Sequence, residues 1–282
     1  MKKITRRSFM AAAGLTVAAL ALTACGGSSS TASSAAASSV ASSAAASSEA
    51  ASAAATELTT VEAGKLTMAT NAAFPPYEMT TDAGEFEGID IETAQAIADK
   101  LGLELQIDDM DFDAALLSVQ QGKADIVMAG VTVTDERKAV MDFSDSYATG
   151  IQSIIVPEGS DIASPDDLAG KKIGTQRGTT GYIYCSDDFG DENVVAYDDG
   201  LTAVQALNNG QVDAVVIDNA PAKEFVAANP GLVILDTSYA EEDYAIGMAK
   251  SSPLEDAINS ALEELKADGT LQAIVDKYIT AE

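Results

Sequence analysis

Apolar residues follow two alternating spacings along most of the chain. Short apolar runs predict buried strands, whereas an apolar residue at every third or fourth position predicts a helix that packs on them. Strands are predicted at Lys65–Thr70, Leu103–Ile107, Ile151–Val156, Lys172–Thr175, Val194–Tyr197, Val233–Leu235 and Tyr244–Met248. Helices are predicted at Asp90–Leu101, Asp113–Gln121, Leu201–Asn208, Ala220–Ala228 and Leu254–Ala267. This alternation of strands and helices is typical of an α/β fold.

One helix–turn–strand pattern occurs twice, 88 residues apart. Residues 117–128 and residues 205–216 each combine a helix, a glycine and a buried apolar strand. Gly122 and Gly210 fit the left-handed conformation that commonly follows the end of a helix. Ordinary αβ alternation would give the same similarity, so we use it for its geometry and infer no duplication.

Four positions directly follow predicted strands and lie where a ligand would bind. Gly130 and Asp218 follow the two repeated strands, whereas Asn71 and Gln176 follow two others. In open parallel sheets, ligands bind beyond the carboxyl ends of the strands. Two lobes whose strand ends face each other are therefore expected to form a cleft lined by these positions.

The order of the elements predicts two lobes with two crossings between them. The crossings are expected near Tyr147–Gln152 and Ser238–Tyr244. Lobe 1 would comprise residues 64–150 and 243–282, and lobe 2 would comprise residues 151–242. A first lobe built from two separate segments explains why the C-terminal helices follow the second crossing.

The first part of the chain predicts export. Four basic residues precede an apolar run at residues 10–22, which is too short to span a bilayer, so residues 1–24 are predicted to be a lipoprotein signal peptide. The sequence Leu22–Cys25 matches a lipobox, which predicts lipidation of Cys25. Residues 26–56 are almost entirely Ser, Ala and Gly, so residues 25–63 should form a flexible spacer. A plain secretory signal is the alternative, and paired arginines leave the export route open.

The composition removes several classes of function. The chain has 44 acidic and 16 basic residues, whereas nucleic-acid binding requires basic patches. It contains no histidine, which removes the commonest general base and the commonest metal ligand. Cys185 has no cysteine to pair with once Cys25 is lipidated. We therefore expect no metal, no cofactor and no nucleic-acid partner.

The most informative motif lies at residues 129–147, where a strand end is followed by hydroxyl side chains and by Arg137. A guanidinium can bind both oxygens of a carboxylate, and Thr132 would add a donor. An arginine behind Thr and Asp would also suit an ion pair at a helix cap. The segment closely resembles the Gly-x-Thr-x-Thr-x-x-Arg segment of extracellular amino-acid-binding proteins that serve ABC importers, solute-binding family 3 of the glutamine-binding type.

The resemblance covers the chain from about Lys65 to Ile279. Its further segments are Asn71–Glu78, Gly88–Glu92, Met110–Phe112, Gly178–Thr180, Ile217–Asn219 and Asp268–Leu271. It implies an α/β type II periplasmic-binding-protein fold, in which two αβ lobes joined by two hinge crossings close around one L-amino acid.

The resemblance places the α-carboxylate of the ligand at Arg137. Thr132 and the backbone of Gly130 would help to bind it from the same lobe. Thr179 and Thr180 would bind it from the other lobe, at a helix N-terminus, where free amides attract anions. An ordinary helix cap is the alternative role of these two threonines.

The other implied site residues contact the rest of the ligand. Asp218 would accept hydrogen bonds from the α-ammonium, unless it only caps the helix that follows. Phe74 and Phe112 would form aromatic walls with a cation–π contact to the ammonium, unless they belong to the core. Tyr244 would either line the cleft or pack at the hinge.

Asn71 and Gln176 are expected to set specificity. Family members that bind arginine or lysine often carry Asp at the position of Asn71, and that carboxylate is absent here. Two neutral amides suit a polar, uncharged side chain such as that of glutamine, asparagine or cystine. Arg177 beside the site would instead favour an acidic ligand, and Glu241–Asp243 a basic one.

The implied function is capture of a free L-amino acid and its delivery to an ABC permease with its ATPase. The protein is expected to be a monomer on the extracytoplasmic side, attached to the membrane only by its lipid, and not an enzyme. One alternative is an enzyme similar to cyclohexadienyl dehydratase, which would depend on carboxylates such as Glu78. Another alternative is an amino-acid sensory module, which would use the same closure.

Overall fold

The computed structural model describes residues 58–279. The predicted signal peptide, the predicted lipidation site Cys25 and the predicted spacer up to residue 57 lie outside the described residues. The last residues of that predicted spacer contact the folded body: Leu58 packs against the core, and the Val61 amide donates to Asp125 at 2.7 Å. The folded body therefore extends further toward the N-terminus than the boundary we expected at residue 64.

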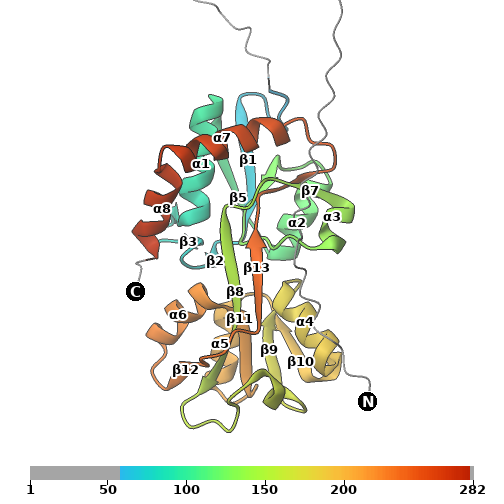
Figure 1. Cartoon of the computed structure of the whole chain (residues 1–282), viewed down its shortest axis with the longest axis vertical. Helices are drawn as coiled ribbons and strands as arrows, with labels where there is room; N and C mark the ends of the chain where they lie inside the picture. Colours follow the sequence, from blue (N-terminus) through green and yellow to red (C-terminus); the bar gives the residue numbers. More distant parts are fainter. Residues whose placement is uncertain (1–57, 280–282) are drawn as a thin grey trace, which may run out of the picture. The chain divides into compact units, whose positions relative to one another are not determined.

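The first main sheet, together with its helices, is called the first lobe (Figure 1). Its strands, in spatial order, are β5 (Glu104–Asp109), β1 (Lys65–Thr70), β6 (Ile126–Val127), β14 (Gly247–Ala249) and β7 (Met141–Phe143). β1 is parallel to β5 and β6, whereas β14 is antiparallel to β6 and β7. The helices are α1 (Ile89–Leu101), α2 (Phe112–Gln120), α3 (Asp135–Val140), α7 (Glu255–Ala267) and α8 (Thr270–Tyr278). A small sheet of β2 (Ala73–Phe74), β3 (Glu78–Thr80) and β4 (Phe86–Glu87) precedes α1.

The second main sheet and its helices are called the second lobe. Its strands, in spatial order, are β10 (Val194–Tyr197), β9 (Ile173–Gln176), β11 (Ala214–Asp218), β8 (Ala148–Pro157) and β12 (Leu232–Ile234), with β13 (Ala240–Tyr244) also on β8. Its α-helices are α4 (Thr180–Phe189), α5 (Gly200–Asn208) and α6 (Asn219–Ala228). Short 3-10 helices lie at Pro165–Leu168 and Asp191–Asn193. Cys185 is a free thiol buried in the core of this lobe.

Helices α1, α7 and α8 pack on one another because each has one apolar face (Figure 1). On α7, the residues Ile258, Leu262 and Leu265 recur every three or four positions and are almost completely buried. On α8, Leu271 and Ile274 continue the same core. Burial of one such side chain stabilises the fold by about 1.5–3 kcal/mol, so these C-terminal helices are bound firmly to the first lobe.

Strands β8 and β13 run side by side between the two main sheets (Figure 1). They pair antiparallel, with Ala148 opposite Tyr244 and Gln152 opposite Ala240. At the end near the first lobe, Tyr244 also forms a backbone bridge with Thr132. A Cβ atom on Gly150 would lie 2.5 Å from the Tyr244 ring, so the glycine lets that ring pack directly on β8. These two strands are called the crossing strands below.

The predicted helices agree with the structure, each within one residue at either end. Gly122 and Gly210 adopt φ angles of 66° and 67°, the left-handed conformation that their positions predicted. The prediction of one strand over Tyr244–Met248 was wrong, because the chain forms β13 up to Tyr244 and resumes as β14 at Gly247. Residues Ala240–Tyr244 lie in the crossing that we expected near Ser238–Tyr244, and they form β13, which pairs antiparallel with β8.

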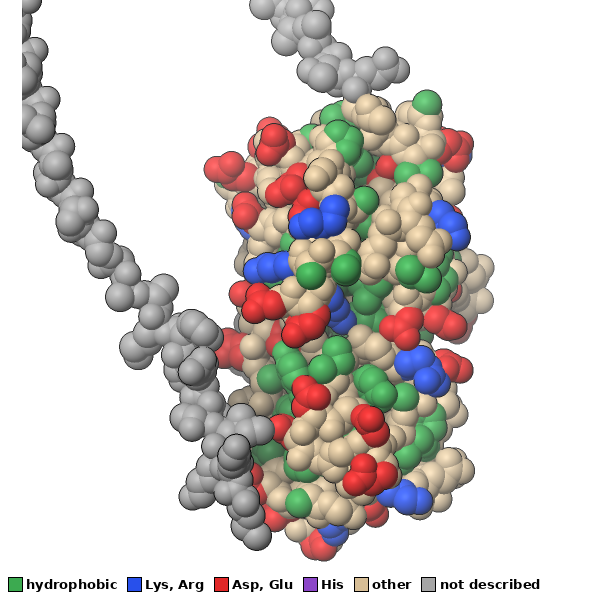
Figure 2. Space-filling model, turned by 90° about the vertical axis from the view of Figure 1, so that its right-hand side faces the viewer, with side chains coloured by type: hydrophobic (Ala, Val, Ile, Leu, Met, Phe, Trp, Pro, Cys, Tyr) green, Lys and Arg blue, Asp and Glu red, His purple; other side chains and the backbone are tan. Residues whose placement is uncertain are grey.

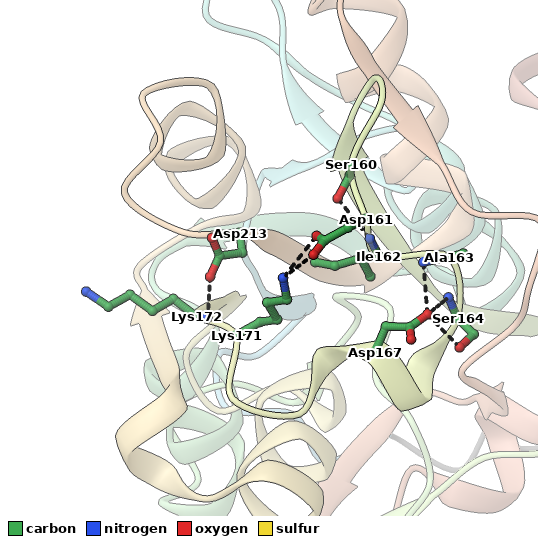
Figure 3. A network of polar contacts seen from close by, with 9 residues as sticks. All are labelled: Ser160, Asp161, Ile162, Ala163, Ser164, Asp167, Lys171, Lys172 and Asp213. Carbon is green, nitrogen blue, oxygen red and sulfur yellow. Dashed lines mark hydrogen bonds and ion pairs between the residues drawn. The ribbon is translucent and has the colours of Figure 1, made fainter.

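A polar network fixes the start of two strands in the second lobe (Figure 3). Lys171 forms an ion pair with Asp161 at 2.9 Å, and Asp167 accepts hydrogen bonds from two preceding backbone amides at 3.0 and 3.1 Å. The Lys172 amide donates to Asp213 at 2.8 Å. Lys172 and Asp213 directly precede β9 and β11, so this contact joins the starts of the two strands. It thereby fixes β9 and β11 relative to each other, and their carboxyl ends reach the cleft.

The described surface is mixed in charge. In Figure 2, acidic side chains are scattered over the visible face, and basic side chains lie singly among them. Within residues 58–279, no helix combines the length and apolar character that crossing a membrane requires.

Candidate ligand-binding site

A cavity of ≈ 430 Å³, measured to its open mouth, lies where the strand ends of the two lobes meet. Ten of the eleven predicted binding residues line it: Asn71, Phe74, Phe112, Gly130, Thr132, Arg137, Gln176, Thr179, Thr180 and Asp218. Five lining residues were not predicted: Glu78, Ala129, Gln152, Val216 and Ile217. The eleventh predicted residue, Tyr244, is not part of the lining.

The two lobes touch each other across this cavity. The Gln176 side-chain amide donates to Asn71 Oδ1 at 2.8 Å, and Arg137 Nη2 donates to the Gly178 carbonyl at 3.2 Å. A Cβ atom on Gly178 would lie 1.6 Å from Asp113 Oδ1, so the lobes approach closely beside the arginine. The described arrangement is therefore a closed one.

Arg137 is held by backbone carbonyl groups and an aromatic ring. Its Nη1 donates to the Thr132 carbonyl at 2.8 Å, and its guanidinium carbon lies 5.3 Å from the centre of the Phe112 ring. Burial lowers the pKa of Arg137, while nearby acidic groups, first among them Glu242, raise it. Among residues 58–279, Arg137 forms no ion pair, so the helix-cap pair that the sequence also allowed is not made.

Gly130 is fixed from behind by a buried carboxylate. Its amide donates to Asp90 at 3.0 Å, and the Tyr147 hydroxyl donates to both oxygens of Asp90 at 2.7 and 2.8 Å. Burial raises the pKa of Asp90 to about 6, although these hydrogen bonds oppose the shift. The Gly130 N–H is thus already used within the protein, and Asp90 positions the strand end that faces the cavity.

Asp218 is a buried carboxylate that faces the cavity. It occupies the N-cap position of α6, but its side chain makes no capping hydrogen bond. It accepts instead from Gln152 Nε2 at 2.7 Å and from the Tyr244 hydroxyl. Burial raises the pKa of Asp218 to about 7, the charge of Glu242 adds to this, and the hydrogen bonds oppose it.

Tyr244 supports the site from behind. It is completely buried, and its ring packs edge-on against Tyr77 with 5.2 Å between the ring centres. Of the two roles that the sequence allowed, packing at the hinge is the one observed. Its hydroxyl orients Asp218 rather than facing the cavity.

The two threonines at the start of α4 have different roles. Thr179 is the N-cap residue: its hydroxyl oxygen accepts from the Tyr182 amide at 3.3 Å and donates to the Gln176 carbonyl at 2.8 Å. Its hydroxyl is therefore used in capping. Thr180 instead donates to Glu242 Oε2 at 2.9 Å.

Glu242, on the crossing strand β13, accepts hydrogen bonds from four groups. They are the Thr132 hydroxyl at 3.2 Å, Gln152 Nε2 at 3.0 Å, the Thr180 hydroxyl at 2.9 Å and the Tyr184 hydroxyl at 2.8 Å. Sequence reasoning treated Glu242 only as one of three acids near a crossing. The two-residue period of a strand places it on the same face as Tyr244, and that signal was available.

Gln152 joins the two ends of the site. Its side-chain nitrogen donates both to Asp218 and to Glu242, so it lies between these two buried carboxyl groups. It is almost completely buried on β8. A glutamine within the apolar run at Ile151–Val156 was the signal that could have identified it.

Glu78 is the second carboxyl group in the cavity lining. It is fully buried, and neither oxygen receives a hydrogen bond from a fixed donor of the described residues. Burial raises the pKa of Glu78 well above its ordinary value, and the charge of Asp90 raises it further.

Asn71 and Gln176 form the end of the cavity away from the crossing strands. Asn71 Nδ2 donates to the Met110 carbonyl at 3.0 Å, and Gln176 Nε2 also donates to the Asp198 carbonyl at 3.3 Å. Both hydrogens of the Gln176 amide are thus engaged. This residue therefore offers a ligand its acceptor oxygen, which suits a ligand side chain that donates hydrogen bonds.

Comparisons with known proteins agree with this geometry. The bacterial extracellular solute-binding proteins, family 3, match residues 66–281. The L-cystine-binding protein TcyJ of Escherichia coli (strain K12) is 33% identical over 226 residues, which cover 78% of this chain and 85% of TcyJ. A solved structure of an ancestral arginine-binding protein bound to glutamine is 42% identical, with a TM-score of 0.74, and covers 77% of this chain and 99% of its own. An ancestral arginine-binding protein bound to arginine is 43% identical, with a TM-score of 0.73, and covers 77% and 98%. The expected type II periplasmic-binding-protein fold is thereby confirmed.

Proposed function

This chain belongs to family 3 of the bacterial extracellular solute-binding proteins, and we propose that its cavity captures one free L-amino acid between two closing lobes. The observation that carries this proposal is that a cation, Arg137, and a carboxyl group held by fixed donors, Asp218, line the same cavity. An α-amino acid carries the complementary pair of charges on two groups attached to the same carbon atom.

The proposed contacts follow from the charges. The ligand α-carboxylate binds the guanidinium of Arg137, whose planar donors suit its two oxygens. The α-ammonium binds Asp218, which Gln152 and Tyr244 hold in place. Phe74 and Phe112 form apolar walls, since both line the cavity and are almost completely buried.

For the ligand side chain we propose a polar, uncharged group. Asn71 and Gln176 are neutral amides, and Gln176 offers its acceptor oxygen. An amide side chain donates to such an acceptor without bringing a charge into a buried site. One similar structure, that of an ancestral arginine-binding protein bound to glutamine, agrees with this choice.

A basic side chain is the second candidate, because Glu78 favours it. This carboxyl group lines the cavity and lacks a fixed donor among the described residues, so in its ionised form it would pair with a ligand cation. The ancestral protein bound to arginine agrees with this second candidate. A comparison of glutamine with arginine, in the wild type and in Glu78→Gln, separates the two candidates.

We propose that ligand binding shifts the two lobes to the closed form, which then delivers the amino acid to an ABC permease with its ATPase. The closing bodies are residues 64–150 with 243–282 and residues 151–242.

In this proposal the protein is a monomer, bound to the outer face of the cell membrane through lipidated Cys25. A sensory role would use the same closure, and stimulation of a reconstituted permease–ATPase by the loaded protein distinguishes transport from sensing.

We propose binding without turnover. The Asp218 carboxyl group accepts hydrogen bonds from two neutral partners, Gln152 and Tyr244, and the relatives described above are named as binding proteins. Conversion of prephenate or arogenate by the purified protein would favour the dehydratase alternative.

The test of the proposed function is thermal unfolding of the purified protein, stripped of bound ligand, against a panel of L-amino acids. A ligand at about 1,000 times its Kd should add roughly 4 kcal/mol to the free energy of unfolding. For a folded body of this size, that corresponds to an increase in Tm of about 8–16 °C. A panel in which no amino acid raises Tm would contradict the proposal.

A further inference from the structure

Glu78 differs from the other carboxyl group of the cavity lining. Asp218 accepts hydrogen bonds from two fixed donors, whereas neither oxygen of Glu78 accepts one from the described residues. Glu78 is nevertheless completely buried, and its backbone on β3 pairs with Phe74, another lining residue. A buried polar group without a partner destabilises a protein, so two such oxygens at a ligand cavity are placed to bond the ligand.

Glu78 lies between the two ends of the cavity. The charge of Asp218, at one end, acts on it, and so does the charge of Asp109. Asp109 accepts from the Ala72 amide at 2.8 Å, directly beside Asn71 at the other end. A ligand held by its α-ammonium at Asp218 extends its side chain toward Asn71, so that side chain passes Glu78.

The surroundings of Glu78 control whether it carries a proton. Burial raises the pKa of Glu78 well above its ordinary value, and the charges of Asp90 on α1, Asp218 on β11 and Asp109 on β5 raise it further. Glu78 therefore keeps its proton to a higher pH than an ordinary glutamate does, whereas a ligand cation beside it would favour the ionised form. The other titratable groups around it are two tyrosine hydroxyls on which its charge acts and the cation of the cavity lining, namely Tyr77, Tyr147 and Arg137.

Each protonation state of Glu78 suits a different ligand side chain. A carboxylic acid has one O–H donor and one carbonyl acceptor, which match the carbonyl and the amino group of a primary amide. A carboxylate has two acceptor oxygens, which match the parallel donors of a guanidinium. Both pairings use two hydrogen bonds in one plane and leave no oxygen of Glu78 without a partner.

We propose that Glu78 determines the specificity of the cavity, as a carboxylic acid that binds the side-chain amide of a ligand such as L-glutamine and as a carboxylate that binds a guanidinium such as that of L-arginine. On the change from the first ligand to the second, the proton of Glu78 passes to the solvent. The inference rests on the proposed function, because Arg137 and Asp218 must hold the α-groups of both ligands. The ratio of the two affinities is then set by pH.

The test compares L-arginine with L-citrulline, whose side chain has nearly the same shape and ends in an uncharged urea group. Both ligands bring the same α-groups, so titration of Asp218 or Asp90 cancels in the ratio of their affinities. Calorimetry from about pH 5 to about pH 9 should show that the preference for arginine over citrulline rises with pH, by up to about tenfold per pH unit.

Glu78→Gln keeps the shape of the protonated side chain but cannot ionise. Its preference should not vary with pH, and at high pH its affinity for arginine should be at least about tenfold below that of the wild type, since a neutral acceptor bonds a cation less strongly than a charged one. The matched control is Glu85→Gln, an exposed position between β3 and β4, which should behave as the wild type.

A proton count keeps the inference testable if Glu78→Gln folds poorly, because it uses the wild type alone. Calorimetry near neutral pH in buffers with different ionisation enthalpies gives the number of protons released on binding. Arginine should release up to about one proton more than citrulline does. Equal proton counts, together with a preference that does not vary with pH, would overturn the inference.

Two other results would also overturn it. If Glu78→Gln weakened the binding of arginine and citrulline equally, Glu78 would contact the shared α-groups rather than the side chain. If the protein bound some other amino acid but neither arginine, citrulline nor glutamine, specificity would have another origin, while the proposed function would stand. A wild type that binds no amino acid would instead contradict the proposed function, so the two failures are distinguishable.

Discussion

At one end of the cavity, Arg137 donates to backbone carbonyls from both lobes, those of Thr132 and Gly178. At the other end, Asp218 accepts from Gln152 and Tyr244, which lie on the crossing strands. The proposed carboxylate-binding end is therefore complete only when the lobes meet, whereas the proposed ammonium-binding end lies within the second lobe and the hinge. The difference suggests that closure is sensed mainly at the arginine.

The largest effect is expected from Arg137→Gln, which removes the cation from the end that depends on closure. A buried ligand carboxylate would then lack its partner, which costs about 3–5 kcal/mol. The affinity should fall by roughly 200-fold to 5,000-fold, as measured by calorimetry. Arg177→Gln is the matched control, because the side chain of Arg177 is 56% exposed. Binding by Arg137→Gln within tenfold of the wild type would remove the central assignment.

Asp218→Asn should change stability at the opposite end. The folded chain holds the Asp218 proton up to about pH 7, whereas the ordinary pKa is 3.8. The ligand-free wild type should therefore lose stability as pH rises from about 4 to about 7, because unfolding lets this group ionise. At pH 8, Asp218→Asn should be more stable than the wild type by roughly 1–3 kcal/mol in urea unfolding, with no gain near pH 4.

The control for that measurement is Asp187→Asn, an exposed position on α4. It removes the same charge without relieving a buried carboxylate, so it should show no pH-dependent gain. An equal gain in both variants would assign the effect to net charge rather than to burial at Asp218.

Ligand affinity should also depend on pH through Asp218. The ammonium binds the ionised carboxylate, so wild-type affinity should fall below about pH 7, by up to about tenfold per pH unit. Arg137 stays charged throughout this range. Asp90, with a pKa of about 6, also titrates here, but it is not in the cavity lining. A pH dependence that persisted in Asp218→Asn would place the titrating group elsewhere.

The smallest effect is expected from Tyr244→Phe. Loss of one hydrogen bond to Asp218 should weaken ligand binding by about threefold to tenfold. It should also move the midpoint of the affinity–pH profile upward, because the carboxylate loses a donor that stabilises its charge. Tyr239→Phe removes a hydroxyl that donates to Asp188 at 2.6 Å and should leave both quantities unchanged.

The sequence predicted the helices well because their signal is local. Each has an apolar residue every three or four positions, and a left-handed glycine follows helices such as α2 and α5. The strand β13 was missed because a strand at an edge of a sheet can be charged, and its pairing with β8 depends on residues about 90 positions away. Hydrophobic spacing carries no information on such pairing.

The site shows the same limit. Residues in motifs at strand ends, such as Asn71, Arg137 and Asp218, could be assigned to the cavity before its geometry was known. Gln152 and Glu242 carried only a weak sequence signal, because their role depends on which donors the two lobes bring to them. The direction of a threonine hydroxyl is decided by its neighbours in space.

The crossing strands have a practical consequence. They carry buried site residues on one face, yet Ile151 is 40% exposed and lies opposite Glu241 in the neighbouring strand. A fluorescent label at Ile151 would thus sit one residue from Gln152 without entering the cavity. Ligand occupancy can therefore be read from the fluorescence of a label at the hinge. Gln152 lies both in the cavity lining and on a crossing strand, so a substitution there that changes ligand preference will also alter how the two lobes move.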